Sequence, residues 1–495
     1  MKNPIKLLMT SIIVIGGVAS LSSCGDSYDG VTINFWHTFG KTVEDGIKQR
    51  ANEFAELVKE HEGKEVRVKL TYKGGYDDIK GEMTKAFSVG DNPTIAVAYP
   101  DHVADYFASE SKAGEFVVDM TKYVDNENYG FGREAWLGDT DGSNDFVEAF
   151  YQESSSYTRD GIYSMPFMKS TEVMLYNLDL VRKAMPYYDA DISTDDQIRD
   201  FMSNLSWDEF MLFCETIKDN MNEISPTLVV PAFYDSDANL FISQCYQNNI
   251  PYAGIDSNGN GYIGFNGISD KSTDEQKKAY NDVLALVKKF KKWYDQGLFD
   301  TKGVNGQYSS YSFTPGKTMF AIGSSGGSGY SFPSTSEFQI EACKVPYSNG
   351  NPLYVTQGPT LTLMNNTKLI KSGKNDEAVL YGWKFIKYLT NPDVNAALCT
   401  NNSEGYIPVR QSAYNTSAFT SFMESDTQYV KVAKVVVNEI QGNYFTAPVF
   451  KGSAELREQC GGGMADFLKL ESKNPTDQEF KTILDRIINQ TVLKM

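Results

Sequence analysis

GIYSMPFMKSTEVMLYNLD, residues 161–179, is the stretch that decides the fold. Its first part ends at Pro166, which has no backbone N–H for a central ladder, so a strand here must stop or lie at a sheet edge. Its second part, residues 171–176, is apolar and rich in β-forming residues, and the Asn-Leu-Asp at its end is typical of a helix cap. Residues 167–170 combine an aromatic ring, a methionine, a cation and a hydroxyl, which suits a cleft wall better than a core. We therefore predict that the chain crosses here from one lobe to another.

The N-terminal part of the chain alternates strand and helix patterns. Strands are predicted at residues 31–36, 66–72 and 94–99, and amphipathic helices at residues 43–58 and 79–89. Strands separated by helices of this length imply βαβ units and a mainly parallel sheet. Ligands of such sheets bind outside the carboxyl ends of the strands, which are here residues 36–38, 72–76 and 99–101.

Five further stretches carry, with residues 161–179, the pattern of a known family. They are INFWHTFG (33–40), LTYKGGYDDI (70–79), SWDEF (206–210), GKTMFAIGSSG (316–326) and GYIPVRQSAY (405–414). In this order they resemble extracellular solute-binding protein family 1, the substrate-binding lipoproteins of ABC importers, in its sugar and glycerol-3-phosphate branch. The resemblance covers the chain from about residue 33 to residue 414.

The resemblance implies an α/β, two-lobed periplasmic-binding-protein-like fold of type II, in which discontinuous lobes are joined by a hinge. We expect the first lobe to comprise residues 31–167 and 358–404, and the second residues 173–345 and 409–495, with hinge crossings near 167–173, 345–358 and 405–409. Such a protein captures a small polar solute between its lobes and delivers it to the permease subunits of the importer.

Candidate ligand-binding residues come from the resemblance and from the residues themselves. The resemblance implies ligand contacts at five positions, Tyr76, Ser170, Ser324, Gly358 and Tyr406. Trp36 and Tyr234 are added because they stand at predicted strand ends, where an aromatic ring can pack on the apolar face of a sugar ring. Asp101 is added because it follows the third predicted strand, where the glycerol-3-phosphate binders have a glutamate.

The expected ligand is a neutral sugar or oligosaccharide rather than a glycerol phosphate. Those binders grip the phosphate with an arginine soon after a Phe-x-x-Gly-like turn, whereas this chain reads Phe450-Lys451-Gly452-Ser453 and its next arginine is Arg457. Without that guanidinium fork a phosphate loses its best bidentate partner.

The N-terminus is typical of an exported lipoprotein. Lys2 and Lys6 precede a short apolar run, and Leu-Ser-Ser-Cys ends at Cys24. That ending resembles a lipobox, which implies a signal peptide at residues 1–23, acylation of Cys24 by palmitate-type chains, a tether at residues 24–30 and a place on the outer face of the cytoplasmic membrane. An ordinary secretory signal with an incidental cysteine is the alternative.

Charge restricts the partners. The net charge of −18 becomes −20 when Lys2 and Lys6 leave with the signal peptide, which carries no acid. Such a surface repels nucleic acid and anionic lipid, so membrane attachment is expected through the lipid anchor alone. We expect a monomer.

No metal or cofactor site is predicted. The five mature cysteines after Cys24 are scattered and are read as buried small hydrophobes: Cys214, Cys245, Cys343, Cys399 and Cys460. Residues 256–267 carry oxygen side chains at calcium-loop spacing but end in Gly267 instead of a glutamate, so a β-hairpin is favoured over a calcium site. The Gly-Ser run at residues 323–329 either offers backbone N–H groups to a ligand or is a flexible surface loop.

Catalysis is not expected. The chain has three histidines and neither GxSxG nor HExxH. The alternative is a secreted cell-surface glycoside hydrolase lipoprotein, which needs a positioned acid and base pair such as Asp235 and Asp237. A third class, an adhesin, needs no closing cleft.

Overall fold

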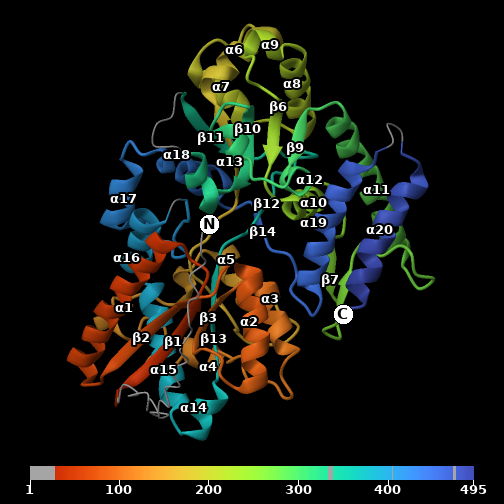
Figure 1. Cartoon of the computed structure of the whole chain (residues 1–495). Helices are drawn as coiled ribbons and strands as arrows, with labels where there is room; N and C mark the ends of the chain where they lie inside the picture. The colour runs from red at the N-terminus through yellow and green to blue at the C-terminus, as the bar shows by residue number, and fades with distance from the viewer. Residues whose placement is uncertain (1–27, 333–337, 404, 472–474) are drawn as a thin grey trace, which may run out of the picture.

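A computed structural model describes residues 28–332, 338–403, 405–471 and 475–495. The predicted signal peptide, Cys24 and the start of the predicted tether lie outside the described residues. Figure 1 shows two lobes, one above the other, each built around its own five-stranded sheet with helices packed outside. The predicted two-lobed α/β fold is confirmed.

The first sheet has the strand order β2-β1-β3-β13-β4. Its strands are β1 (Val31–His37), β2 (Val66–Tyr72), β3 (Ile95–Ala98), β4 (Met165–Pro166) and β13 (Thr360–Leu363). β1 pairs in parallel with β2 and β3, as the βαβ pattern predicts. β13 returns from a distant part of the chain and pairs antiparallel with both β3 and β4. β4 is an edge strand, which confirms the prediction from Pro166.

The second sheet has the order β11-β5-β10-β6-β9. Its strands are β5 (Glu172–Asn177), β6 (Val230–Tyr234), β9 (Phe299–Thr301), β10 (Thr318–Ser324) and β11 (Ile340–Lys344). Every residue of β5 is buried, and β5 pairs antiparallel with β10 and β11 on its two sides. Because β4 belongs to the first sheet and β5 to the second, the chain passes between the lobes within residues 167–171.

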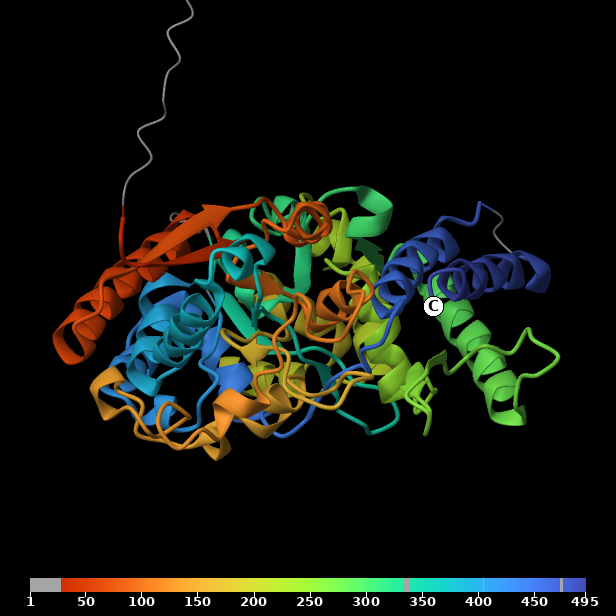
Figure 2. The same cartoon turned by 90° about the horizontal axis from the view of Figure 1, so that it is seen from below.

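Helices cover both sheets. In chain order they are α1 (Lys41–Glu62), α2 (Tyr76–Val89), α3 (Pro100–Phe107), α4 (Thr121–Val124), α5 (Glu148–Gln152), α6 (Leu178–Tyr188), α7 (Asp195–Ser203), α8 (Trp207–Asp219), α9 (Met221–Ile224), α10 (Asp237–Gln247), α11 (Asp274–Asp295), α12 (Lys302–Asn305), α13 (Ser310–Phe313), α14 (Thr367–Lys371), α15 (Asn375–Leu389), α16 (Pro392–Ala397), α17 (Ser417–Met423), α18 (Gln428–Lys434), α19 (Ser453–Lys469) and α20 (Asp477–Val492). Ser206 and Glu209 form the predicted capping box at the start of α8. Figure 2 shows that α11 and α20 lie at one end of the molecule, away from the first lobe.

Three chain segments lie side by side where the lobes meet. Lys169 pairs with Ile407 and Ser170 pairs with Gln357, each through two backbone hydrogen bonds of 2.8 to 3.0 Å. Gly358 has a φ of 101°, and a Cβ there would lie 2.4 Å from the carbonyl oxygen of Met168. Only glycine therefore lets the second segment approach the first so closely.

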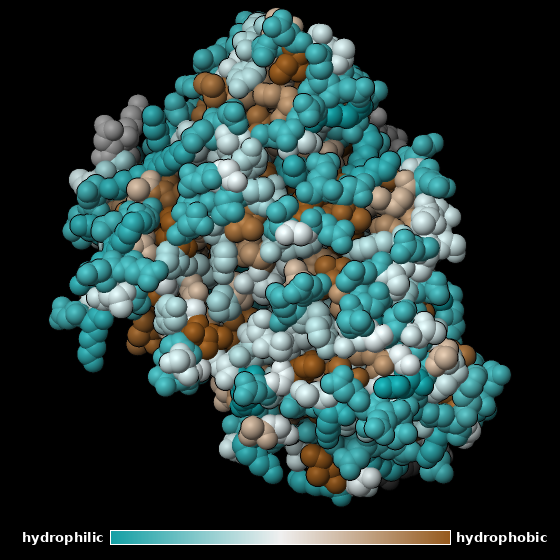
Figure 3. Space-filling model, turned by 180° about the vertical axis from the view of Figure 1, so that it is seen from behind, coloured by the Kyte–Doolittle hydropathy of each residue, from teal (hydrophilic) through white to brown (hydrophobic). Residues whose placement is uncertain are grey.

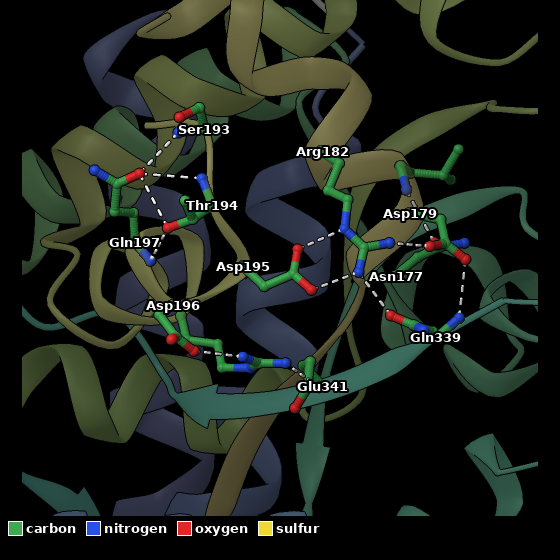
Figure 4. Close-up of polar contacts among 12 residues, drawn as sticks. Asn177, Asp179, Arg182, Ser193, Thr194, Asp195, Asp196, Gln197, Gln339 and Glu341 are labelled. Atoms are coloured by element: carbon green, nitrogen blue, oxygen red, sulfur yellow. Dashed lines mark hydrogen bonds and ion pairs between the residues drawn. The ribbon is translucent and has the colours of Figure 1, made fainter. Parts of the chain in front are cut away.

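Arg182 of α6 ties the edge strand β11 to two helices (Figure 4). Its guanidinium donates to both carboxylate oxygens of Asp195 at 2.6 and 2.7 Å and to Oε1 of Gln339 at 2.7 Å, and it pairs with Asp179. The backbone N–H of Gln339, the residue before β11, donates to Asp179 at 3.0 Å. This network fixes the start of the strand.

Backbone pairing and burial show what the 256–267 loop and the cysteines do in the structure. β7 (Ala253–Ile255) and β8 (Gly261–Ile263) form an antiparallel hairpin, which confirms the preferred interpretation of residues 256–267. All five described cysteines are buried thiols without a disulfide, as predicted. In the described part of the chain, none of the helices combines the length and apolar character that a membrane span needs.

Candidate ligand-binding site

A cavity of about 970 Å³ lies between the two lobes. Both sheets, the crossing segments and α19 contribute to its wall. Eight tyrosines line it: Tyr72, Tyr76, Tyr99, Tyr252, Tyr308, Tyr311, Tyr330 and Tyr406. The cavity is also lined by Thr38, Gly75 and Asp101, which lie at the predicted carboxyl ends of the first lobe's strands.

Six of the eight predicted ligand-binding residues line this cavity. They are Tyr76, Asp101, Ser170, Ser324, Gly358 and Tyr406. They come from six separate stretches of sequence, so only the fold brings them together. Gly358 contributes backbone alone, and its close approach to Met168 explains why glycine stands there.

Trp36 is not among the lining residues, which corrects the prediction for this position. Successive residues of β1 alternate between the buried face and the opposite face, and Trp36 lies opposite to Phe35 and His37. The ammonium of Lys73 sits 3.8 Å from the centre of its ring. A position at the end of a strand does not decide which face its side chain occupies.

Tyr234 is also absent from the lining, and Glu172 reaches the cavity in its place. Tyr234 is the last residue of β6 and is 2% exposed. Its hydroxyl donates to Oε2 of Glu172. The tyrosine therefore supports a lining residue and is not one itself.

Two tyrosines of the first lobe and one from a predicted crossing lie in the cavity wall. The rings of Tyr76 and Tyr99 stack with centroids 3.9 Å apart and an interplanar angle of 17°. Thr38 and Tyr406 line the cavity beside Tyr76. Burial raises the pKa of Tyr406 to about 12, so its hydroxyl remains protonated at neutral pH.

The Gly-Ser run is held against the crossing. Ser325 donates its backbone N–H to the carbonyl of Thr171 at 2.7 Å, and the Ser324 hydroxyl donates to that of Ser170 at 3.3 Å. Gly326 and Gly327 of the short 3₁₀ helix at Ser325–Ser331 line the cavity. Of the two interpretations of this run, the ligand-facing one fits its place in the structure.

A buried polar group on the second lobe escaped the sequence analysis. Glu172 is 3% exposed, and its Oε1 accepts a 2.9 Å hydrogen bond from Nδ2 of Asn239. Burial raises the pKa of its carboxyl to about 7, against the hydrogen bonds from Tyr234 and Asn239, which favour the ionised form. Oδ1 of Asn239 accepts from the guanidinium of Arg457. The available signal was a single acid at the start of a mostly apolar strand.

The charged residues of the lining carry a small excess of acid. Asp101, Glu153, Glu172 and Asp235 face Lys169, Lys302 and Arg457. Lys169 and Glu153 form an ion pair with side chains 1% and 3% exposed, so they neutralise each other. The sequence argument against a phosphate ligand rested on the missing arginine soon after the Phe450 turn. Arg457 lines the cavity, so that argument is partly wrong. In the described part of the chain, no group of three or more histidine, cysteine or acidic side chains is arranged to hold a metal ion.

Comparisons with known proteins agree with this geometry. The sequence profile of a family described as bacterial extracellular solute-binding protein matches residues 49–429. The sn-glycerol-3-phosphate-binding periplasmic protein UgpB of Shigella dysenteriae serotype 1 (strain Sd197) is 24% identical over 411 residues, which is 82% of this chain and 80% of that protein.

Solved structures show the same fold. The cyclic alpha-maltosyl-1,6-maltose binding protein from Arthrobacter globiformis has a TM-score of 0.64 at 15% identity, covering 94% of this chain and 99% of that one. UgpB from Mycobacterium tuberculosis in complex with glycerophosphocholine has a TM-score of 0.62 at 16% identity, covering 92% and 97%. These comparisons lend no support to the glycoside hydrolase alternative.

Proposed function

The chain belongs to the family of bacterial extracellular solute-binding proteins, the substrate-binding components of ABC importers, and from this premise we propose that its ligand is a neutral sugar or short oligosaccharide. The solute is captured in the cavity between the lobes and delivered to the membrane permease. The observation that carries this proposal is the wall of eight tyrosines interspersed with hydroxyl, amide and carboxylate groups. Aromatic faces pack on sugar rings while the polar groups bind the ring hydroxyls.

The charge of the cavity supports a neutral ligand over a phosphate. Once Lys169 and Glu153 are paired, three carboxylates face two cations, Lys302 and Arg457. A phosphate held by Arg457 would lie close to Glu172, because both residues bind the same amide of Asn239. The negative charges of a phosphate and of the Glu172 carboxylate would repel each other, and the repulsion is stronger in a buried site.

A thermal-shift and calorimetry screen tests the proposal. The panel contains glucose, maltose, maltotriose, mannotriose, sn-glycerol-3-phosphate and glycerophosphocholine. A solute at a hundred times its Kd adds about 2.7 kcal/mol to the free energy of unfolding, so a true ligand raises the melting temperature clearly. We expect a neutral saccharide to give the largest rise. Tighter binding of either phosphate than of every neutral sugar would overturn the proposal.

We further propose that the lobes divide at the crossings predicted from the sequence and that the protein acts as a lipid-anchored monomer. The backbone pairs Lys169–Ile407 and Ser170–Gln357 support two of the crossings. Figure 3 shows a rear face that is mostly hydrophilic, with hydrophobic residues in small separate groups, which supports a monomer. The Leu-Ser-Ser-Cys ending supports the anchor.

A Cys24→Ala variant tests the anchor. We expect it to fractionate with soluble protein and to bind the same solutes, because the anchor consists of acyl chains on that one side chain. Wild-type protein and a Cys214→Ala variant serve as controls, since Cys214 is a buried thiol. Retention of the Cys24 variant on membranes after a high-salt wash would contradict the lipoprotein proposal.

A further inference from the structure

Glu172 is an unusual residue to bury. It lies in β5, a strand whose six residues are all buried, yet it lines the cavity. A buried carboxylate costs several kcal/mol in desolvation, and replacing buried charges with apolar side chains is often neutral or stabilising. A purely structural role therefore gives little reason to keep an acid at this point.

The carboxylate has acceptor capacity left over. Each oxygen can accept about two hydrogen bonds. Tyr234 donates to Oε2 and Asn239 donates to Oε1, so one lone pair on each oxygen remains. Because Glu172 lines the cavity, a solute in the cavity can supply the missing donors.

Arg457 offers the complementary donors. Its guanidinium has five N–H groups. Within the described residues, its hydrogen bond goes to Oδ1 of Asn239, and Arg457 itself lines the cavity. Asn239 thus holds the acceptor Glu172, from β5, beside the donor Arg457, from α19.

We propose that Glu172, Asn239 and Arg457 form a recognition triad that selects solutes carrying two neighbouring hydroxyl groups. One hydroxyl donates to Glu172 and the next accepts from Arg457, while Asn239 fixes their spacing. This inference rests on the proposed function, and it identifies the part of the cavity that binds the solute's hydroxyl groups. Solutes without such a pair leave the remaining acceptor capacity of the buried Glu172 unused and the free N–H groups of the partly buried Arg457 unpaired, which lowers affinity.

The triad also links binding to pH. The groups that face Glu172 are Tyr234 from β6, Asp235 after it, Asn239 from α10 and Arg457 from α19. Burial raises the pKa of Glu172 to about 7 in the absence of ligand. A hydroxyl that donates to the carboxylate favours the ionised form and lowers that pKa in the complex. Affinity is therefore present above the free-state pKa and is lost as the pH falls through it, with proton release on binding.

Calorimetry on four proteins tests the triad. Wild type, Glu172→Gln, Arg457→Lys and Glu439→Gln are titrated with maltotriose and mannotriose at about pH 6 and about pH 8. Glu439 is the matched control, because burial also raises the pKa of its carboxyl but it does not line the cavity. We expect about a tenfold loss of affinity in each triad variant, equivalent to about 1.4 kcal/mol. Glu172→Gln should lose the pH dependence, whereas Arg457→Lys and Glu439→Gln should keep it.

The outcomes separate the two proposals. If wild type binds neither saccharide, the proposed function fails for these sugars and the triad, which rests on it, falls as well. If wild type binds but Glu172→Gln keeps both its affinity and its pH dependence, the triad is wrong while the proposed function stands. Titration of wild type in two buffers of different ionisation enthalpy needs no variant, and an absence of proton release near neutral pH overturns the role of Glu172.

Discussion

Tyr406 lies in the cavity between the two lobes. It lines the cavity together with Tyr76 of the first lobe, and a Cβ on Gly326 of the second lobe would lie 2.8 Å from its ring. The preceding Gly405 has a φ of 130°, and a Cβ there would meet the carbonyl oxygen of Ser325 at 1.8 Å. The close approach of the two lobes therefore depends on glycine at both contact points.

We predict that Tyr406→Ala weakens saccharide binding by about 1 to 3 kcal/mol, because it removes one stacking face and one hydroxyl from the cavity. Tyr406→Phe, which removes the hydroxyl alone, should cost less. Calorimetry measures the affinities and thermal unfolding measures the stability of the ligand-free protein. Unchanged affinity together with a large loss of stability would make Tyr406 a packing residue.

Gly358→Ala is predicted to destabilise the protein by more than about 2 kcal/mol, since it combines a left-handed backbone with a clash against Met168. Gly63→Ala is the matched control, because its φ is 65° and nothing lies within 4 Å of the added Cβ. Its backbone strain alone should cost about 1 kcal/mol. Urea unfolding measures both, and equal losses would show that the close approach at Gly358 does not matter.

At the scale of elements, the edge strand β11 depends on α6 and α7 through Arg182. The guanidinium and its partner Asp195 are about a third exposed, so solvent screens their attraction. The network matters chiefly because Gln339, immediately before β11, joins it through both its side chain and its backbone.

Arg182→Met should therefore lower the free energy of unfolding by only about 1 kcal/mol while loosening the strand locally. We expect faster amide hydrogen exchange in β11 and unchanged saccharide affinity. Arg486→Met is the control, since Arg486 forms an exposed pair with Asp466 far from this strand in the sequence. Unaltered exchange in β11 would show that the strand is held by sheet pairing alone.

At the scale of the molecule, the structure has its lobes in contact. Tyr406 meets Gly326, α3 contacts α19, and Val449 packs in the same hydrophobic cluster as Val103 of the first lobe. Tyr406, Gly326 and Val449 also line the cavity, so separation of the lobes opens it further to a solute. The narrow set of crossing segments is the natural place for that motion.

We predict that saturating saccharide shifts the protein towards this closed arrangement and reduces its radius of gyration in small-angle scattering. The bound radius should equal that calculated from the structure. A ligand-free protein that is open, and that keeps its radius when calorimetry shows full binding, would contradict domain closure.

Local patterns were enough to determine the fold class and many of the elements. The parallel pairing of β1, β2 and β3, the edge position of Pro166, the hairpin at residues 253–263 and the capping box at Ser206 each depend on residues close together in the chain. Backbone periodicity, turn chemistry and the missing N–H of proline act over such short distances, so sequence alone reveals them. The family resemblance added the two lobes and five positions that line the cavity.

Only the tertiary structure decided which side chains share the cavity. β13 enters the first sheet between β3 and β4, although it lies far along the chain from both. Glu172, Asn239 and Arg457 come from three distant segments and meet through hydrogen bonds, whereas Trp36 turns to the other face of β1. Such a constellation is set by long-range packing and by strand register, in which a shift of one residue reverses every side chain. Neither long-range packing nor strand register can be predicted from a short-range pattern in the sequence.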